Sequence, residues 1–429
     1  MARKVFISFL GFSNYGESSY VYGTYKSKNV RYVQEATLDY LIKKEQWTNE
    51  DVSYILLTKG AEAANWVDNG HKDRTTREVI KQTGLESQLQ AMNLPLEVKP
   101  IKNLPDGNNE EEIWKIFSRV FQEIKEDDEL YFDITHGFRY LPMLTIVLGN
   151  YLKFLRNVTI KHISYGNYEG RNKVANESPI IDLLPFSSLQ DWTYAAAQFL
   201  NRGDVSSLVE LSKNELKPLL QDAKGKDENL NNFRKFITSL ETVIMERNFC
   251  RGIEIVESKG LNELQEITSN LKHSVVPQMA PIVEKIKDSF DEFSPTENVM
   301  NGFAAAKWCV KNSLYQQAIT ILQENIITLL CFKENLNWHL EVQREIINIA
   351  FFAVCDNKQN NEVIWNLKKM DKAEEEEKEN YRKLIRKAIE NPILNELAPL
   401  HIRIKDIRND FNHSGMRINK MSAKDMKPS

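Results

Sequence analysis

The feature that most constrains the fold is a single change of hydrophobic period, near residue 188. Before it, short apolar runs alternate with helical segments, which predicts a Rossmann-like α/β domain over residues 1–187 with a mostly parallel sheet. A hairpin over 165–185, closed by Pro185, is expected to end this half. Strands are predicted at 4–11, 53–60, 96–101, 129–135 and 159–166, and helices at 31–44, 77–92, 111–124 and 140–155.

The second half, residues 188–429, has scarcely any alternating β-branched run, and helical periodicity dominates it. We therefore predict an all-α domain, in which about 190–290 could form a separate helical linker subdomain. The run over 372–390 has acidic residues first and basic residues later, as a solvated helix favours, and we do not interpret it as a metal site. Helices are expected at 189–201, 205–220, 228–249, 260–289, 298–311, 314–333, 339–355, 374–390 and 396–413.

Composition narrows the functional classes. With 56 basic and 60 acidic residues the net charge is −4, which argues against a general nucleic-acid coat and confines any such contact to a local patch. The four cysteines have no metal-ligand spacing, so neither a zinc site nor a disulfide framework is expected. The longest apolar stretch is interrupted by Asn150 and Lys153, and no signal peptide opens the chain. We expect a cytoplasmic protein with no membrane contact.

Two loops at predicted strand ends have the composition of an anion site. Ligands of open α/β sheets lie where strands end and helices begin. The loop at 11–24 is rich in glycine and hydroxyl groups, so Gly11, Phe12, Ser13, Asn14 and Tyr15 are candidate ligand-binding residues, although a flexible polar loop explains the same residues. Thr58, Lys59 and Gly60 precede a predicted helix and could hold an anion, or could form an ordinary helix cap.

A third loop, "THGFR" at 135–139, is the most informative. Thr135 could cap a helix and Gly137 could make a tight turn, but Arg139 is expected in the first helical turn, where the helix dipole disfavours a cation. An arginine there is typical of a bound anion. His136 could contact a base or simply close the turn.

Near the other end of the chain, Arg408 and His413 are the side-chain types that cleave RNA without a metal. With 18 Arg and 7 His in 429 residues, a pair at this spacing is expected about 0.3 times by chance, so the pair alone is weak. The predicted helix buries a stripe of Leu400, Ile404, Ile407 and Phe411 and ends at Gly415, which places His413 in its last turn. The two side chains are separated by about 140° around the helix, so two copies of the chain would make a more complete site.

The residues "DITHGFR" (133–139), after a strand near residue 130, resemble the signature of CARF domains in CRISPR-associated ribonucleases of type III systems. Such proteins join a CARF domain to a C-terminal helical HEPN domain whose nuclease motif is R-x4-H. Arg408 and His413 match that motif, and Asn409 matches the polar residue that often follows its arginine. The two motifs occur in the expected order, and the resemblance covers the whole chain.

The resemblance implies a sensor of cyclic oligoadenylate, with cyclic tetra-adenylate favoured, that switches on cleavage of single-stranded RNA in antiviral defence. It implies a homodimer, with higher oligomers open, an enzyme that needs no metal or cofactor, and products with 2′,3′-cyclic phosphate ends. Asn409 and Asn412 could position the phosphate, whereas His401 and Arg403 could grip RNA or be ordinary solvated residues. Two alternatives stay open: a ligand-sensing regulator that does not cut RNA, and an enzyme that also degrades its activator, for which Thr135, His136 and Lys59 would be suspected.

Overall fold

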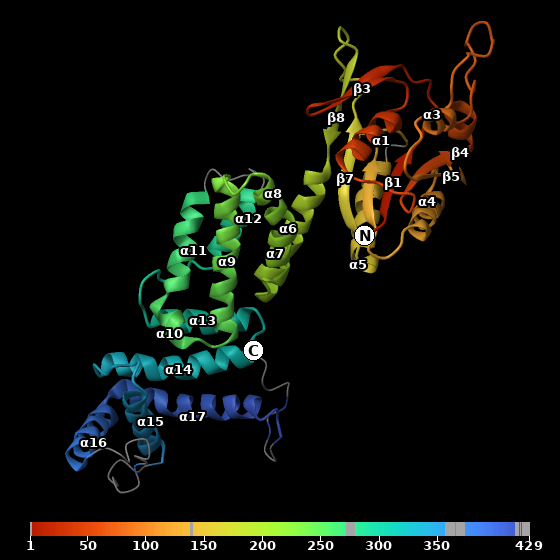
Figure 1. Ribbon diagram of the computed structural model, residues 1–429. Coiled ribbons are helices and arrows are strands. Elements are labelled where there is room, and N and C mark those ends of the chain that lie inside the picture. The colour runs from red at the N-terminus through yellow and green to blue at the C-terminus, as the bar shows by residue number, and fades with distance from the viewer. Residues whose placement is uncertain are drawn as a thin grey trace. The chain divides into compact units, whose positions relative to one another are not determined.

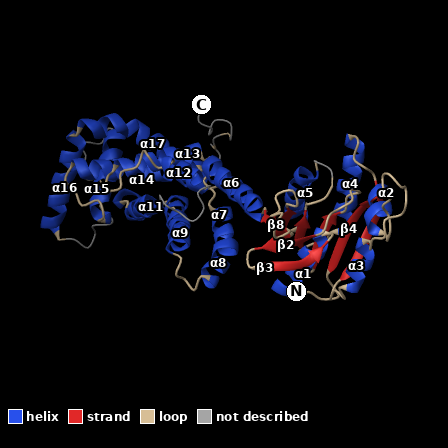
Figure 2. Cartoon of the chain, turned by 90° about the horizontal axis from the view of Figure 1, so that it is seen from above, coloured by secondary structure: helices blue, strands red, loops and turns tan. Residues whose placement is uncertain are grey.

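The computed structural model describes residues 2–137, 140–271, 279–356, 365, 374–416, 420 and 422. The chain forms two compact units, residues 1–188 and 189–429. Figure 2 shows the strands in the first unit, and helices dominate the described part of the second. The predicted fold class, a mostly parallel α/β sheet followed by a helical region, is confirmed.

The first unit is built on one eight-stranded sheet with the order β3-β2-β8-β7-β6-β1-β4-β5. The five strands from β7 to β5 are parallel to one another, β8 is antiparallel to β7, and β3 is antiparallel to β2. The strands are β1 (Lys4–Phe9), β2 (Ser18–Tyr22), β3 (Tyr25–Val30), β4 (Val52–Thr58), β5 (Glu97–Leu104), β6 (Glu129–Asp133), β7 (Thr159–Gly166) and β8 (Glu177–Asp182).

Helices cover both faces of this sheet, as its apolar strands require. The helices are α1 (Val33–Lys44), α2 (Lys59–Ala61), the π-helix η1 (Glu62–Trp66), α3 (Leu85–Ala91), α4 (Glu110–Glu123) and α5 (Leu141–Arg156). Side chains of α4 and α5 pack with Ile7 and Phe132 on one face, while those of α1 and α3 pack with Phe6 and Tyr131 on the other. The two sets alternate along β1, β4 and β6, as a doubly covered sheet demands. Figure 1 labels α1, α3, α4 and α5 beside the strands of this unit.

Two expectations for this unit were wrong. The loop predicted over 11–24 contains β2, which with β3 adds a hairpin to the sheet; its polar residues suggested a loop, but Ser18 is buried and its Oγ bonds Ser178 Oγ at 2.8 Å. The helix predicted over 77–92 is restricted to α3. It begins after Gly84, where a Cβ would lie 2.4 Å from the backbone oxygen of Trp66, so the chain is packed against another backbone segment there.

The second unit consists of helices. They are α6 (Leu184–Arg202, which begins in the first unit), α7 (Ser206–Leu211), the π-helix η2 (Ser212–Leu216), α8 (Lys217–Asp222), α9 (Glu228–Asn248), α10 (Gly252–Glu257), α11 (Lys259–Asn270), α12 (Ala280–Asp288), α13 (Met300–Lys311), α14 (Tyr315–Lys333), α15 (Glu341–Cys355), α16 (Glu375–Glu390) and α17 (Pro392–Asn412). The short helix α10 was not predicted, and the helix predicted over 260–289 is described as α11 and α12, with residues 272–278 outside the described part.

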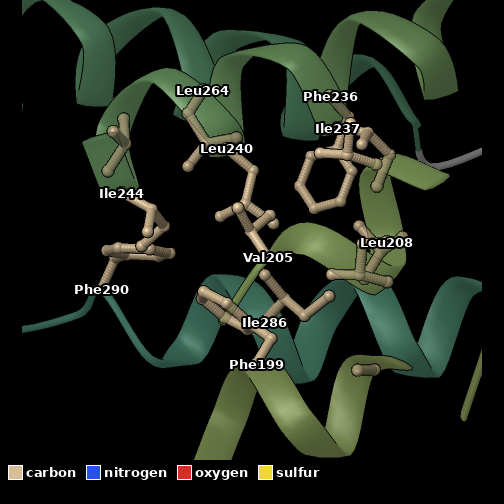
Figure 3. Packing of buried hydrophobic residues seen from close by; sticks show 14 of the residues in the cluster. Phe199, Val205, Leu208, Phe236, Ile237, Leu240, Ile244, Leu264, Ile286 and Phe290 are labelled. Atoms are coloured by element: carbon tan, nitrogen blue, oxygen red, sulfur yellow. The ribbon is translucent and has the colours of Figure 1, made fainter. Parts of the chain in front are cut away.

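Two apolar cores stabilise this unit. In the first, side chains such as Phe199, Leu240 and Ile286 converge from the helices α6, α9 and α12, as Figure 3 shows. The second joins α14, α15, α16 and α17. Helix α14 contributes to both cores, with Ile321 in the first and Ile326 in the second. It is therefore apolar along much of its surface, and the C-terminal helix α17 packs on it.

The four cysteines are all free thiols. Within the described ranges, no three carboxylate, histidine or cysteine side chains come together as a metal site would need. None of the helices in the same ranges combines the length and the apolarity needed to cross a bilayer.

Candidate functional site

The first unit contains a pocket of about 380 Å³ at the carboxyl ends of its parallel strands. This is the edge at which open α/β sheets bind ligands. Eight predicted ligand residues line it: Gly11, Phe12, Ser13, Tyr15, Thr58, Thr135, His136 and Gly137. The remaining lining residues are mainly apolar: Phe9, Leu10, Leu56, Leu104, Pro105, Ile116 and Leu141. The structure thus brings together loops that are up to 126 positions apart, from Gly11 to Gly137.

Three of the predicted ligand residues that the structure describes are not among those that line this pocket, and the cap expected at Thr58 is present. Asn14, Lys59 and Gly60 are exposed and are absent from the pocket wall. Thr58 is the N-cap of α2, and its Oγ1 accepts a hydrogen bond from the Ala61 amide at 3.3 Å. Arg139 lies outside the described residues. Helix α5 begins at Leu141, and Tyr140 is its N-cap.

The loop after β1 is held in place by two side chains that the sequence did not single out. Asn65 is fully buried and its Nδ2 donates to the carbonyl oxygens of Gly11 (2.9 Å) and Ser13 (2.8 Å). Arg31 Nη1 donates to the Tyr15 carbonyl at 2.5 Å. Three backbone carbonyls are satisfied in this way, which fixes a loop that otherwise lacks regular structure. The sequence did contain a signal for this role, because Asn65 is an uncharged polar residue next to Trp66 in the mostly apolar segment "AEAANW".

His136 forms the inner wall of the pocket with Tyr15. The two rings are stacked, with centroids 4.0 Å apart and an interplanar angle of 22°. A Cβ at Gly11 would lie 2.3 Å from the Tyr15 hydroxyl, so only glycine allows this close approach. Burial lowers the pKa of His136 to about 4, and its Nε2 has no hydrogen-bond partner among the described residues. At neutral pH the ring is therefore an uncharged surface suited to a base or another flat group.

The hydroxyl of Thr135 is used by the fold. Its Oγ1 donates to Asp133 Oδ1 at 2.5 Å and accepts from the Gly166 amide at 2.7 Å. Asp133 is fully buried and also accepts from Ser8 Oγ at 2.7 Å, and burial raises the pKa of this carboxyl group. Thr135 thus connects the ends of β6 and β7, and it does not cap α5 as one interpretation of the sequence suggested.

Gly137 makes the turn between β6 and α5. Its φ of +130° is unfavourable for any residue with a side chain, and a Cβ would lie 2.2 Å from Leu141 Cδ1. Glycine is required here for both reasons.

In the second unit, Arg408 lies on α17 and contacts α14. Its Nη1 donates to Gln323 Oε1 at 3.0 Å and lies 3.6 Å from Glu324 Oε1. Gln323 is buried, whereas the Arg408 side chain keeps 31% of its exposure. The guanidinium is therefore anchored on one side and open on another. Three consecutive polar residues, "QEN" at 323–325, interrupt the apolar sequence "AITILQENIITLL" and were the available signal for these partners.

His413 is the C-cap of α17 and is exposed. The helix ends in a Schellman motif: the Gly415 amide donates to the Asp410 carbonyl and the Ser414 amide to the Phe411 carbonyl, both at 3.0 Å. Asn409 is half-buried, and Asn412 Oδ1 accepts from Gln316 Nε2 at 3.3 Å. The pair Arg408 and His413 is thus presented at the free end of a helix, with His413 in contact with solvent.

The face of α17 that is buried differs from the prediction. Leu400 is 47% exposed, while His401 is buried and stacks on Phe351 with centroids 4.1 Å apart. His401 is therefore neither a solvated residue nor available to grip RNA. The predicted stripe was wrong by one position at this turn, because an imidazole packed on an aromatic ring takes the place expected for leucine.

The buried His401 makes stability depend on pH. Burial lowers its pKa from 6.5 to about 4, so protonation favours the unfolded chain, and stability that is present above pH 6.5 is lost as the pH falls toward 4. From pH 7 to pH 5 we expect a loss of about 2 kcal/mol, and His401→Phe should remove it. Urea unfolding of the full chain, followed by far-UV circular dichroism, measures both. His413→Phe, which replaces an exposed imidazole on the same helix, is the control. An equal pH dependence in parent and His401→Phe would contradict the assignment.

Comparison with known proteins fits this geometry. Residues 5–179 match the CARF domain of the CRISPR system endoribonuclease Csx1. The CRISPR-associated protein MJ1674 of Methanocaldococcus jannaschii is 25% identical over 237 residues, which are 54% of this chain and 34% of that protein. The chain thus spans about a third of the length of this curated relative. The α/β unit is a CARF domain. The matches support a CRISPR-associated, CARF-containing protein.

Proposed function

We propose that the protein is a metal-independent endoribonuclease of type III CRISPR defence, which cleaves single-stranded RNA when its CARF domain binds cyclic oligoadenylate. The observation that carries the proposal is the presence, on one chain, of a CARF domain with a pocket at its strand ends and of Arg408 and His413 at the free end of α17. The helical unit acts as the HEPN nuclease.

The reaction is attack of a ribose 2′-hydroxyl on the adjacent phosphorus. The bond to the 5′-oxygen of the next nucleotide breaks, which leaves a 2′,3′-cyclic phosphate and a 5′-hydroxyl. The open side of the Arg408 guanidinium binds the phosphate and stabilises the charge of the transition state. His413, exposed at the helix end, takes or supplies the proton, and Asn409 helps to position the phosphate.

The first test is cleavage of a fluorescent single-stranded RNA in EDTA, with and without cyclic tetra-adenylate. Loss of proton transfer or of charge stabilisation typically costs a hundredfold or more, so Arg408→Ala and His413→Ala should each lower the ligand-stimulated rate by about a hundredfold. Arg234→Ala, at an exposed arginine of α9, should keep the parent rate. Tight ligand binding without any cleavage would instead favour the regulator that does not cut RNA.

The CARF pocket is proposed to bind the activator. Phe12 lines it and is 61% exposed, so its ring is free to stack on an adenine base. Phe12→Ala should weaken cyclic tetra-adenylate binding by about tenfold without changing the unfolding temperature, because little buried surface is lost. Calorimetric titration measures the affinity. Phe249→Ala, a phenylalanine of the helical unit with 60% exposure, is the matched control. Equal affinities for the parent and Phe12→Ala would place the ligand elsewhere.

Helix α5 offers the surface on which two copies would pair. It presents a row of exposed apolar side chains, which monomeric proteins seldom leave in water. They are Met143, Ile146, Val147, Tyr151, Phe154 and Leu155. The helix begins at Leu141, which lines the pocket, so pairing through α5 about a two-fold axis would bring two pockets toward one ring-shaped ligand.

Charges on this face should prevent pairing. The double variant Met143→Glu, Phe154→Glu is expected to sediment as a monomer at concentrations where the parent is a dimer, because each dimer would bury four carboxylates. Its ligand affinity should fall as well. Val174→Glu adds a charge at a fully exposed residue of the loop between β7 and β8 and should leave the dimer intact. A dimeric double variant would exclude this face.

A further inference from the structure

The helical unit contains a second pocket, of about 240 Å³, beside the helix that anchors Arg408. It lies among α10, α13, α14 and the start of α15. Its lining mixes polar and apolar groups, and the polar and aromatic ones include Glu324, Thr328, Trp338, His339 and Arg344. None of these residues was singled out by the sequence, and the reaction proposed above does not use them.

Glu324 connects this pocket to Arg408. Its Oε1 lies 3.6 Å from Arg408 Nη1, while its Oε2 lies 2.8 Å from Arg344 Nη2. Arg344 also donates to Thr328 Oγ1 at 2.8 Å and to the Glu324 carbonyl at 3.0 Å, so its guanidinium is fixed in the wall. Two arginines share one carboxylate, so these three groups together carry a charge of +1, while a second carboxylate, that of Glu257, lies 3.8 Å from His339 Nε2. A phosphodiester backbone is attracted to such a place.

The lining also includes two adjacent aromatic rings that are tilted relative to each other. The centroids of Trp338 and His339 are 3.8 Å apart, with an interplanar angle of 31°. Trp338 is buried, whereas the His339 side chain is 39% exposed. Proteins that recognise single-stranded RNA stack unpaired bases on aromatic or guanidinium planes and bind the backbone with arginine. This pocket therefore combines aromatic rings with a guanidinium fixed in its lining, and the positively charged side chain of Arg408 lies nearby.

We propose that this pocket is the subsite for one unpaired nucleobase next to the phosphate that Arg408 holds. The base stacks on His339, which rests on Trp338, and the backbone passes Glu324 to reach Arg408. The inference rests on the proposed ribonuclease function and deepens it, because it assigns a substrate-binding subsite for single-stranded RNA. A base in a duplex could not enter, since both of its faces are already stacked.

The test combines a protein change with a substrate change. The probe is a short fluorescent RNA with one cleavage site, made either complete or with the base removed from the nucleotide on one side of the cleaved bond. Binding to the full-length His413→Ala protein, saturated with cyclic tetra-adenylate, is measured by fluorescence anisotropy, and cleavage by the parent is measured in parallel.

We expect His339→Ala to weaken binding of complete RNA by about tenfold, the size of one lost stacking contact. Removal of the base on one side of the bond should have the same effect. Combining the two changes should add nothing further, which a merely structural role of His339 would not produce. His339→Phe should restore binding, and Leu340→Ala, at the neighbouring residue with 49% exposure that does not line the pocket, should bind as the parent does.

Each outcome decides one of the two proposals. RNA cleavage that depends on Arg408 but is insensitive to His339→Ala and to base removal would overturn the subsite and leave the ribonuclease standing. Base-dependent binding through His339 without cleavage by the parent would support the subsite and overturn the ribonuclease. Independent, additive effects of the two changes would also overturn the subsite, and RNA that does not bind would overturn both.

Discussion

The CARF pocket depends on one buried carboxylate. Asp133, at the end of β6, is removed from water, and a charged or neutral carboxyl group in that position needs hydrogen-bond donors. Ser8 and Thr135 supply them from β1 and from the loop after β6, and Thr135 in turn accepts from Gly166 at the end of β7. Three neighbouring parallel strands are thus fixed at their carboxyl ends. The loops that leave this edge begin from fixed positions, so a pocket forms between them.

In the second unit, helix α14 fixes the surroundings of the candidate site, as Asp133 does in the first. Because this helix contributes side chains to both apolar cores, any shift of the helix would disturb the packing of both. Its neighbouring residues Gln323 and Glu324 nevertheless serve polar partners: Gln323 anchors Arg408, and Glu324 faces both Arg408 and Arg344. An arginine anchored on such a helix is held in place before a ligand arrives, and for the proposed reaction this would lower the entropic cost of reaching the reactive geometry.

The sequence predicted the layers of this protein better than its contacts. Periodicity alone separates the α/β half from the helical half, and strand ends alone suggest where Gly11, Thr58 and Thr135 meet. Periodicity could not find the β2–β3 hairpin, because Ser18 is buried by pairing with Ser178, far along the chain. Such pairings are non-local. The same limit explains why Asn65 and Glu324 were missed: a polar residue in an apolar segment is visible, but its partner is not. The burial of His401 likewise depends on Phe351, a residue of another helix.

The charges around Arg408 explain how its guanidinium can be held in the free protein and still be able to take an anionic ligand. Its ion pair with Glu324 spans 3.6 Å between side chains that keep 31% and 44% of their exposure, and such pairs contribute about 0–1 kcal/mol. The hydrogen bond to the buried Gln323 holds the guanidinium more firmly. In the proposed reaction, an RNA phosphate would therefore replace Glu324 at small cost while Gln323 keeps Arg408 in place. Glu324 would not be left unpaired, since Arg344 lies 2.8 Å from its other oxygen and stays bound to its carbonyl. Only the weak ion pair between Arg408 and Glu324 would be broken in this exchange, and the packing of α14 against α17 would stay the same.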